Sequence, residues 1–186
     1  MSQRLLIAPD KFKGCLSAPA VASAIEAGVR KVIADAQISR MAISDGGEGF
    51  SQLLGEQLGM KRQRVRCHDA MGRVVEATYF HGDGVAVMEM AEAAGMWRIS
   101  NGDVDPLNAS TFGVGEMIGD AAKLPGITKI VIGLGGSATN DGGMGMAAAL
   151  GANFLDKAGH VLEPTPAGIC GRLAEVDLGR MKELPE

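Results

Sequence analysis

The sequence predicts an α/β fold in which a parallel sheet of the Rossmann or flavodoxin type is joined by a smaller mixed α/β subdomain. Short apolar strands alternate with helical patterns before residue 60 and again after residue 106, which is typical of α/β proteins. Glycine-rich polar loops follow two of these strands, in a chain that holds 27 glycines among 186 residues. With 46% hydrophobic and 22% charged residues, the chain can bury the core of an ordinary domain.

The first 60 residues predict two consecutive strand–loop–helix units. Residues 4–8 form an apolar strand, and Ser17 is the N-cap of a helix whose apolar residues recur at helical spacing. A second strand is expected near residues 40–44, followed by a glycine-rich loop and a helix that begins after Gly49. Because crossover helices join parallel strands, we expect these two strands to pair in parallel.

The middle of the chain predicts a different arrangement. Residues 64–67 and 74–80 flank a five-residue turn and indicate an antiparallel hairpin, and a third strand covers residues 85–90. We therefore divide the chain into a parallel α/β portion and a hairpin-containing portion of a second subdomain, which comprise residues 1–60 with 106–186, and residues 61–105, respectively.

The rest of the chain predicts one further strand–loop–helix unit. Its expected elements are a turn at residues 91–95, a helix capped by Ser110 or Thr111, a strand at 129–134, a polar loop at 135–143 and a helix at 146–150. After Pro164 the pattern predicts no further element.

Charge and cysteine content exclude several classes of protein. The net charge of −4 and the lack of a basic cluster argue against a nucleic-acid partner. No apolar run reaches the length of a membrane span, so no membrane partner is expected. Three cysteines match no metal or redox spacing, which favours free thiols and a reducing cytoplasm. The sequence leaves a homo-oligomer open.

The most informative segment is the glycine-rich loop at residues 133–143, which follows an apolar strand and precedes a helix. Exposed backbone amides and a helix dipole at such a position favour an anion, and glycines let the backbone approach a phosphate. The alternative is a polar turn with an N-cap. The residues predicted to hold the phosphates of a nucleotide are Gly135, Gly136, Ser137, Thr139, Asn140 and Gly142. Asp141 is predicted to hold a metal ion or to accept a proton.

Two known phosphate motifs can be compared with this loop. The P-loop is excluded, because no Lys follows the final glycine. The dinucleotide fingerprint remains open, since Gly133, Gly135 and Ala138 fit G-x-G-x-x-A. Asp156 lies 18 residues beyond Ala138, near the position of a ribose-binding acid. An NAD-dependent oxidoreductase is therefore the alternative function.

Two further clusters follow the first two predicted strands, where open α/β sheets bind their ligands. Their acids would bind Mg²⁺ or substrate hydroxyls, and Lys11 or Lys13 would contact a carboxylate or phosphate, although exposed turns would show the same residues. The predicted substrate-binding residues are Asp10, Lys13, Asp45, Gly46, Gly47 and Glu48. The three histidines are scattered and suggest neither a metal site nor a catalytic dyad. This inventory favours phosphoryl transfer, which depends on positioning and charge neutralisation.

In chain order, the motifs resemble those of the bacterial glycerate kinases that make 2-phosphoglycerate. They are residues 10–14, 44–49, Asp69 with Gly72 and Arg73, and residues 89–91, 110–116 and 133–143. The resemblance covers essentially the whole chain, and the Gly-Gly-Ser-Ala-Thr-Asn-Asp-Gly-Gly run is highly specific. It implies a phosphotransferase that uses ATP and Mg²⁺ to phosphorylate D-glycerate.

Members of that family are about twice as long as this chain and have two α/β domains with the active site between them. The resemblance therefore implies an N-terminal half, and a non-catalytic ligand-binding fragment is the third hypothesis. Position and chemistry assign the catalytic role to Asp141, Asp45 and Lys13. Asp141, or alternatively Asp45, would hold Mg²⁺ or accept the proton of the glycerate hydroxyl.

Overall fold

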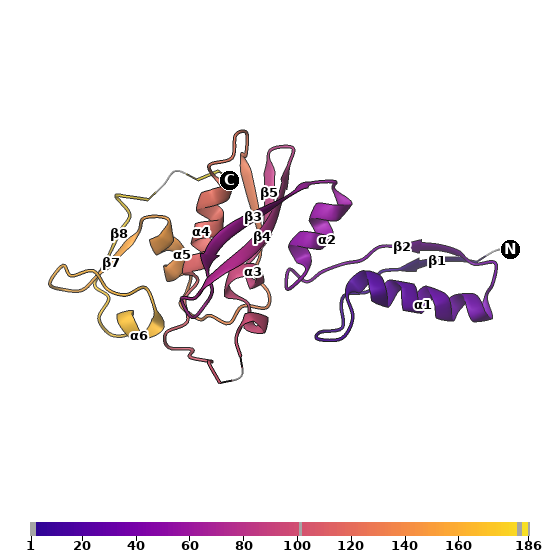
Figure 1. The fold of residues 1–186 in the computed structure, drawn as a ribbon, viewed down its shortest axis with the longest axis horizontal. Helices are drawn as coiled ribbons and strands as arrows, with labels where there is room; N and C mark the ends of the chain where they lie inside the picture. Colours follow the sequence, from indigo (N-terminus) through magenta and orange to yellow (C-terminus); the bar gives the residue numbers. More distant parts are fainter. Residues whose placement is uncertain (1–2, 101, 182–183, 186) are drawn as a thin grey trace. The chain divides into compact units, whose positions relative to one another are not determined.

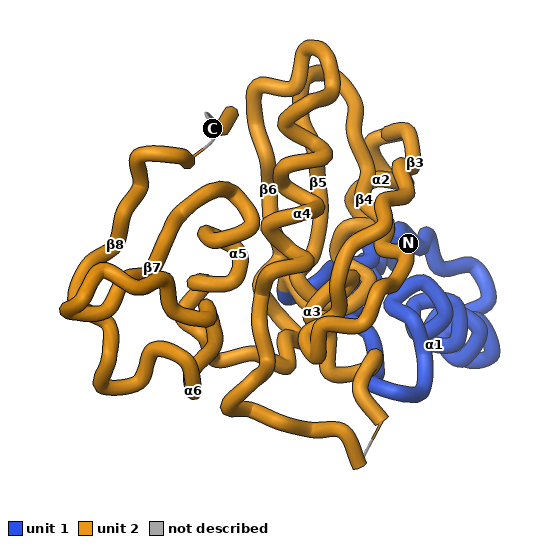
Figure 2. Tube along the Cα trace, turned by 60° about the vertical axis from the view of Figure 1, so that its left-hand side comes forward, with its two compact units in different colours: residues 1–45 blue, residues 46–186 orange. Residues whose placement is uncertain are grey.

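A computed structural model describes residues 3–100, 102–181 and 184–185, and it confirms the α/β class (Figure 1). The chain divides into unit 1, Met1–Asp45, and unit 2, Gly46–Glu186 (Figure 2). We describe each unit by itself. The subdomain boundaries expected at residues 60 and 106 stay a prediction.

Unit 1 is a strand–helix–strand element, as the apolar pattern predicted. It consists of β1 (Arg4–Ile7), α1 (Ala18–Val32) and β2 (Gln37–Arg40). β1 and β2 pair in parallel, with Leu5 opposite Ile38. α1 begins after Ser17 with a proline in its first turn, and an ion pair between Arg30 and Glu26 at 2.8 Å supports its last turns.

The position predicted for the second strand was wrong by a few residues. It was expected at residues 40–44, whereas β2 ends at Arg40. The chain beyond β2 remains extended along β1, because the amides of Met41 and Ile43 donate to the carbonyls of Ile7 and Pro9 at 2.9 and 3.2 Å. The apolar residues of this irregular continuation produced the strand-like pattern.

Unit 2 is organised around one mixed sheet with the strand order β3–β4–β5–β6. The strands are β3 (Lys61–His68), β4 (Val74–Gly82), β5 (Val85–Glu89) and β6 (Lys129–Gly133). β3 and β4 form the predicted antiparallel hairpin, β4 and β5 are also antiparallel, and β5 pairs in parallel with β6. Residues before and after position 106 therefore contribute to the same sheet.

Helices pack against this sheet and complete the core of unit 2. They are α2 (Phe50–Gln57), α4 (Phe112–Ala121) and α5 (Met144–Ala149). α2 contacts β4 and β5, whereas α4 contacts β3 and α5. The approach of α4 is close, since a Cβ at Gly113 would run into the carbonyl oxygen of His68. The buried Tyr79 hydroxyl donates to Asp120 on α4 at 2.8 Å, which ties the helix to β4.

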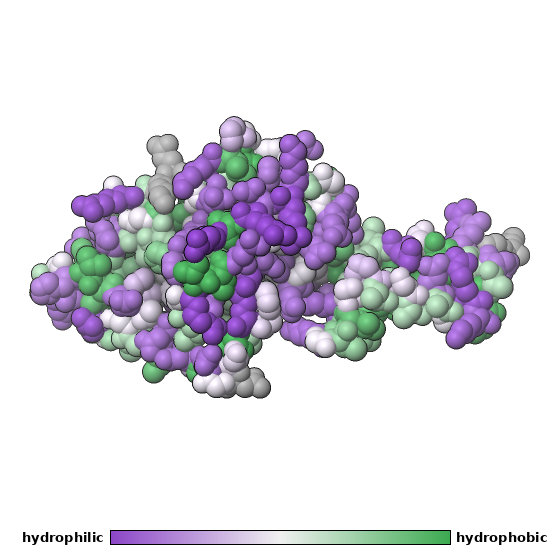
Figure 3. All heavy atoms as spheres, viewed as in Figure 1, coloured by the Kyte–Doolittle hydropathy of each residue, from purple (hydrophilic) through white to green (hydrophobic). Residues whose placement is uncertain are grey.

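The edge strand β3 presents a strongly charged face to solvent. Figure 3 shows hydrophilic residues over the part of unit 2 that Figure 1 assigns to β3 and β4. The exposed basic residues of β3 are Lys61, Arg62, Arg64 and Arg66, and Arg64 pairs with Glu76 of β4 at 3.2 Å. The expectation that the chain lacks a basic cluster was therefore wrong for this strand. Charged side chains of this kind keep an edge strand from pairing with another chain.

Short elements were the least predictable from the sequence. The expected turn at residues 91–95 is the helix α3 (Ala91–Ala94), which the 3₁₀ turn η1 (Met96–Arg98) follows. β7 (Asn153–Leu155) pairs antiparallel with β8 (Glu175–Asp177), and α6 (Pro166–Ile169) lies between them in the chain. Elements of three or four residues are too short to produce a periodic pattern.

The three cysteines differ in burial, and this difference predicts their reactivity. Burial, assisted by the nearby Glu116 carboxylate, raises the pKa of the Cys67 thiol to about 12, whereas Cys15 and Cys170 are exposed. Because the thiolate is the reactive species, we expect DTNB at pH 8 to label two thiols rapidly and the third only after unfolding in urea.

The matched control is Cys15→Ser, which should remove one rapid thiol and leave the slow one unchanged. Equal labelling rates for all three thiols in the native protein would contradict the buried position of Cys67.

Candidate functional site

The two glycine-rich loops predicted to bind ligands meet within unit 2. The amide of Gly135 donates to the carbonyl of Gly46 at 3.0 Å. A Cβ at Gly135 would lie 2.7 Å from the Cα of Gly47, and one at Gly133 would run into the carbonyl of Gly46. These glycines therefore serve the close approach of one loop to the other.

The loop at residues 46–49 is fixed by a buried carboxylate at the end of β5. The side chain of Glu89 is 2% exposed, and its two oxygens accept from the amides of Gly49 and Ser51 at 2.9 and 2.7 Å. Amides at the start of α2 are thereby satisfied within the protein. Of the predicted substrate-binding residues in this loop, Gly47 is buried and Glu48 is exposed.

Asp141 is the corresponding anchor of the second loop. It is 2% exposed, and its Oδ2 accepts from the amide and the hydroxyl of Thr111 at 2.7 and 2.8 Å and from the amide of Gly145 at 3.0 Å. Oδ1 accepts from the amide of Gly143 at 3.0 Å. The carboxylate thus joins the glycine-rich loop to the starts of α4 and α5.

The partner of Asp141 was not identified from the sequence. Thr111 was a candidate helix cap, and it occupies the N-cap position of α4 without a side-chain capping bond. Its hydroxyl instead donates to Asp141 and accepts from the amide of Met146 at 2.9 Å. The only sequence signal was a polar residue at the start of each helix, which does not indicate that the two meet.

The segment at residues 137–140 carries the hydroxyl and amide groups predicted to contact phosphate. The hydroxyls of Ser137 and Thr139 lie 2.7 Å apart, and the amide of Thr139 donates to the Ser137 hydroxyl at 3.2 Å. Both residues are half-buried, and Asn140 is exposed. The two hydroxyls share one hydrogen bond, so they retain donor and acceptor capacity for a ligand.

The same loop is also bonded to the segment that contains α3 and η1. The amide of Ala138 donates to Ala94 at 2.8 Å, and that of Met96 donates to Gly136 at 3.0 Å. Gly136 and Gly142 have φ angles of +74° and +63°, which L side chains rarely adopt. The shape of the loop is therefore set by backbone bonds and by left-handed glycines.

The predicted substrate residues of unit 1 form a group of their own. Lys11 Nζ lies 3.2 Å from Asp45 Oδ1, and the backbone amide of Lys11 donates to Asp10 Oδ1 at 2.6 Å. The side chain of Lys11 is 13% exposed, that of Asp45 is 55% exposed, and Lys13 is exposed. The structure therefore brings Lys11 into contact with Asp45, and the predicted contact of Lys13 with a substrate carboxylate or phosphate stays a prediction.

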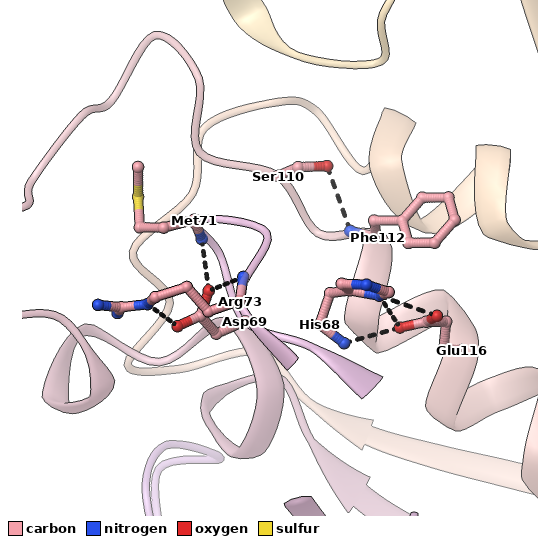
Figure 4. Close-up of polar contacts among 7 residues, drawn as sticks. All are labelled: His68, Asp69, Met71, Arg73, Ser110, Phe112 and Glu116. Atoms are coloured by element: carbon pink, nitrogen blue, oxygen red, sulfur yellow. Dashed lines mark hydrogen bonds and ion pairs between the residues drawn. The ribbon is translucent and has the colours of Figure 1, made fainter. Parts of the chain in front are cut away.

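A second polar cluster lies where the β3–β4 turn meets α4 (Figure 4). Asp69 is buried and accepts from the amides of Met71 and Arg73, both at 2.9 Å, and from Arg73 Nε at 2.7 Å. Glu116 accepts from the amide of His68 at 2.7 Å and contacts its Nδ1 at 2.9 Å. His68 therefore has a carboxylate partner 48 residues away, which no local sequence pattern indicated, and the expectation that the histidines form no catalytic dyad stays a prediction.

The structure gives little support to the prediction that Asp141 binds a metal ion. Within the described ranges, no three His, Cys, Asp or Glu side chains are grouped so as to hold a metal. Mg²⁺ often needs only one or two carboxylates together with substrate phosphates, but the oxygens of Asp141 already accept four hydrogen bonds. The geometry favours an anchoring role for Asp141, and its role as metal ligand or proton acceptor stays a prediction.

Comparison with known proteins identifies the family to which these motifs belong. Residues 5–185 match the glycerate kinase family. The chain belongs to this family. Its members include a glycerate kinase of Halalkalibacterium halodurans, which is 39% identical over 95% of this chain and 47% of its own length. The glycerate 2-kinase of Escherichia coli K12 is 41% identical over 84% of this chain and 42% of its own.

A solved structure supports the same relationship at the level of the fold. A glycerate kinase 2 from Salmonella typhimurium LT2 superposes with a TM-score of 0.78 at 37% identity, and the match covers 97% of this chain and 48% of that one. The chain thus spans about half the length of the family members that it matches.

The alternative of an NAD-dependent oxidoreductase does not fit the structure. A dinucleotide fingerprint opens a helix within a parallel βαβ unit, whereas α5 begins only at Met144, six residues after the end of the G-x-G-x-x-A match. β7, which follows α5, pairs antiparallel with β8 and belongs to a different sheet from β6. Asp156 lies in a turn, where its Oδ1 accepts from the amides of Ala158 and His160.

The anchoring role of Asp141 predicts that Asp141→Asn destabilises the protein. In either orientation of its side-chain amide, an asparagine at position 141 directs its NH₂ group at a backbone amide that now donates to the carboxylate. We expect the free energy of unfolding to fall by about 2–4 kcal/mol, measured by urea denaturation followed by circular dichroism.

Asn140→Asp provides the matched control, because it exchanges the same two groups at the neighbouring exposed position. It should change the free energy of unfolding by less than about 0.5 kcal/mol. Equal stability of Asp141→Asn and the wild type would exclude the anchoring role.

Proposed function

We propose that this chain supplies the nucleotide-binding loop and part of the glycerate site of a glycerate kinase that forms 2-phosphoglycerate from D-glycerate and ATP. The observation that carries the proposal is the fixed loop at residues 133–143, which presents paired hydroxyls in a chain that belongs to the glycerate kinase family. Phosphoryl transfer depends mainly on positioning and charge neutralisation, and a loop anchored at Asp141 meets the first requirement.

On the nucleotide side, the proposed ligands of the phosphates are the hydroxyls of Ser137 and Thr139, the amide side chain of Asn140 and the backbone near Gly136 and Gly142. The amide of Gly135 already donates to Gly46, so its part in the proposal is to hold the two loops together. On the glycerate side, the proposed groups within unit 1 are Asp10, Lys11, Lys13 and Asp45. The substrate-binding role of Gly46, Gly47 and Glu48 stays a prediction from the sequence.

For Asp45 we propose a direct chemical role. Half of its side chain is exposed, and the ammonium group of Lys11 lies 3.2 Å from one of its oxygens. A carboxylate held in this way can accept the proton of a substrate hydroxyl, and a nearby lysine can contact a substrate carboxylate. Mg²⁺ enters the proposal together with the ATP phosphates, and no residue of this chain is assigned to it.

The remaining expectations concern the location of the protein in the cell and its oligomeric state. None of the helices in the described part of the chain combines the length and the apolar character that crossing a membrane requires. The cytoplasmic location and the homo-oligomer stay predictions.

Calorimetric titration of the chain with ATP tests the nucleotide-binding role. We expect ATP to bind, NADH not to bind, and Thr139→Val to weaken ATP binding about 10-fold, because a hydrogen bond to a charged phosphate oxygen is lost. Thr128→Val is the matched control, since it removes an exposed hydroxyl that donates to the carbonyl of Gly84.

Equal ATP affinities of both variants would remove Thr139 from the site, and binding of NADH in preference to ATP would contradict the kinase proposal. Release of ADP upon addition of D-glycerate, with ³¹P NMR to identify the product, tests the catalytic step. ATP binding without ADP release would favour the hypothesis of a non-catalytic ligand-binding fragment.

A further inference from the structure

The single tryptophan of the chain is held beside the loop that we propose to bind the phosphates. Trp97 lies in η1, and its neighbour Met96 donates its amide to the carbonyl of Gly136 at 3.0 Å. Gly95 forms an antiparallel bridge with Ser137. The backbone that carries the indole is therefore bonded directly to the backbone that carries the hydroxyls.

The orientation of the indole is fixed along its polar edge. Nε1 of Trp97 donates to the carbonyl of Ala91 at 2.9 Å. A Cβ at Gly95 would lie 2.7 Å from the same nitrogen, so the ring occupies space that only a glycine leaves open. A ring held in this way loses little conformational freedom when it binds a ligand.

One face of the indole is covered by Arg98, whose guanidinium carbon lies 4.4 Å from the ring centroid. Arg98 is itself held in place, because its Nη2 donates to the carbonyl of Glu76 at 2.8 Å and lies 3.7 Å from Glu92. This arrangement is a cation–π contact, and it prevents the ring from turning.

Despite these contacts Trp97 is 52% exposed, and its neighbour Met96 and Leu134 of the loop are 50% and 68% exposed. Because the polar edge of the indole and one of its faces already contact the protein, the surface that the indole exposes is apolar. An exposed apolar surface that adjoins a polar loop is typical of a site that binds a ligand with both characters.

We propose that Trp97 is the stacking surface for the adenine ring of ATP, while the triphosphate contacts the hydroxyls of Ser137 and Thr139. This inference rests on the proposed nucleotide-binding function and adds to it a binding surface for the adenine base. Stacking on an aromatic side chain needs no particular hydrogen-bonding pattern, and Arg98 on the opposite face keeps the indole in the orientation that a base requires.

Intrinsic fluorescence tests this arrangement directly, because Trp97 is the only tryptophan. In the 186-residue chain, ATP should quench the tryptophan emission with saturation, whereas inorganic tripolyphosphate should bind without quenching. Trp97→Ala should weaken ATP binding about 10-fold by calorimetry and change tripolyphosphate binding less than about 2-fold. Trp97→Phe, which keeps an aromatic face, should retain most of the affinity for ATP.

Leu178→Ala is the control, since it truncates an equally exposed apolar side chain elsewhere in unit 2 and should leave both affinities unchanged. Unchanged fluorescence with ATP bound, together with wild-type ATP affinity of Trp97→Ala, would overturn the stacking role and leave the phosphate loop intact. Failure of both ATP and tripolyphosphate to bind would overturn the proposed nucleotide function, and the stacking role with it.

Discussion

The buried carboxylate of Asp141 is the interaction on which the arrangement of unit 2 depends. A carboxyl group at 2% exposure is tolerated only when its oxygens are satisfied, and here four donors satisfy them. Two of these donors belong to Thr111, ahead of α4, and the others are the amides of Gly143 and Gly145 at the start of α5. The path of the glycine-rich loop and the packing of both helices are therefore one structural unit.

Glu89 has the same anchoring role in the loop at residues 46–49. Its carboxylate, also 2% exposed, accepts from Gly49 and Ser51 and fixes the chain that leads into α2. The two anchored loops then meet at the bond between Gly135 and Gly46, where absent side chains permit the contact. Gly133 and Gly135, which lie in the segment predicted to bind phosphate, thus serve to join one loop to the other.

The sequence predicted elements whose pattern is local and failed where distant residues decide. The helix α1, the hairpin of β3 and β4, and the strands β5 and β6 followed from apolar spacing. The predicted position of β2 was wrong because the chain beyond Arg40 still forms hydrogen bonds beside β1 without being a regular strand. The bond between Thr111 and Asp141 joins residues 30 positions apart, and that between His68 and Glu116 joins residues 48 apart. Neither distance is encoded in a local pattern.

The same contrast separates two kinds of acidic residue that the sequence treated alike. A carboxylate that binds a metal or accepts a proton needs a lone pair directed at the ligand. The oxygens of Asp141 and Glu89 are occupied by backbone and hydroxyl donors, whereas Asp45 is 55% exposed and contacts Lys11. Proximity to a glycine-rich loop therefore does not by itself identify a catalytic acid, and burial with complete hydrogen bonding argues for an anchor.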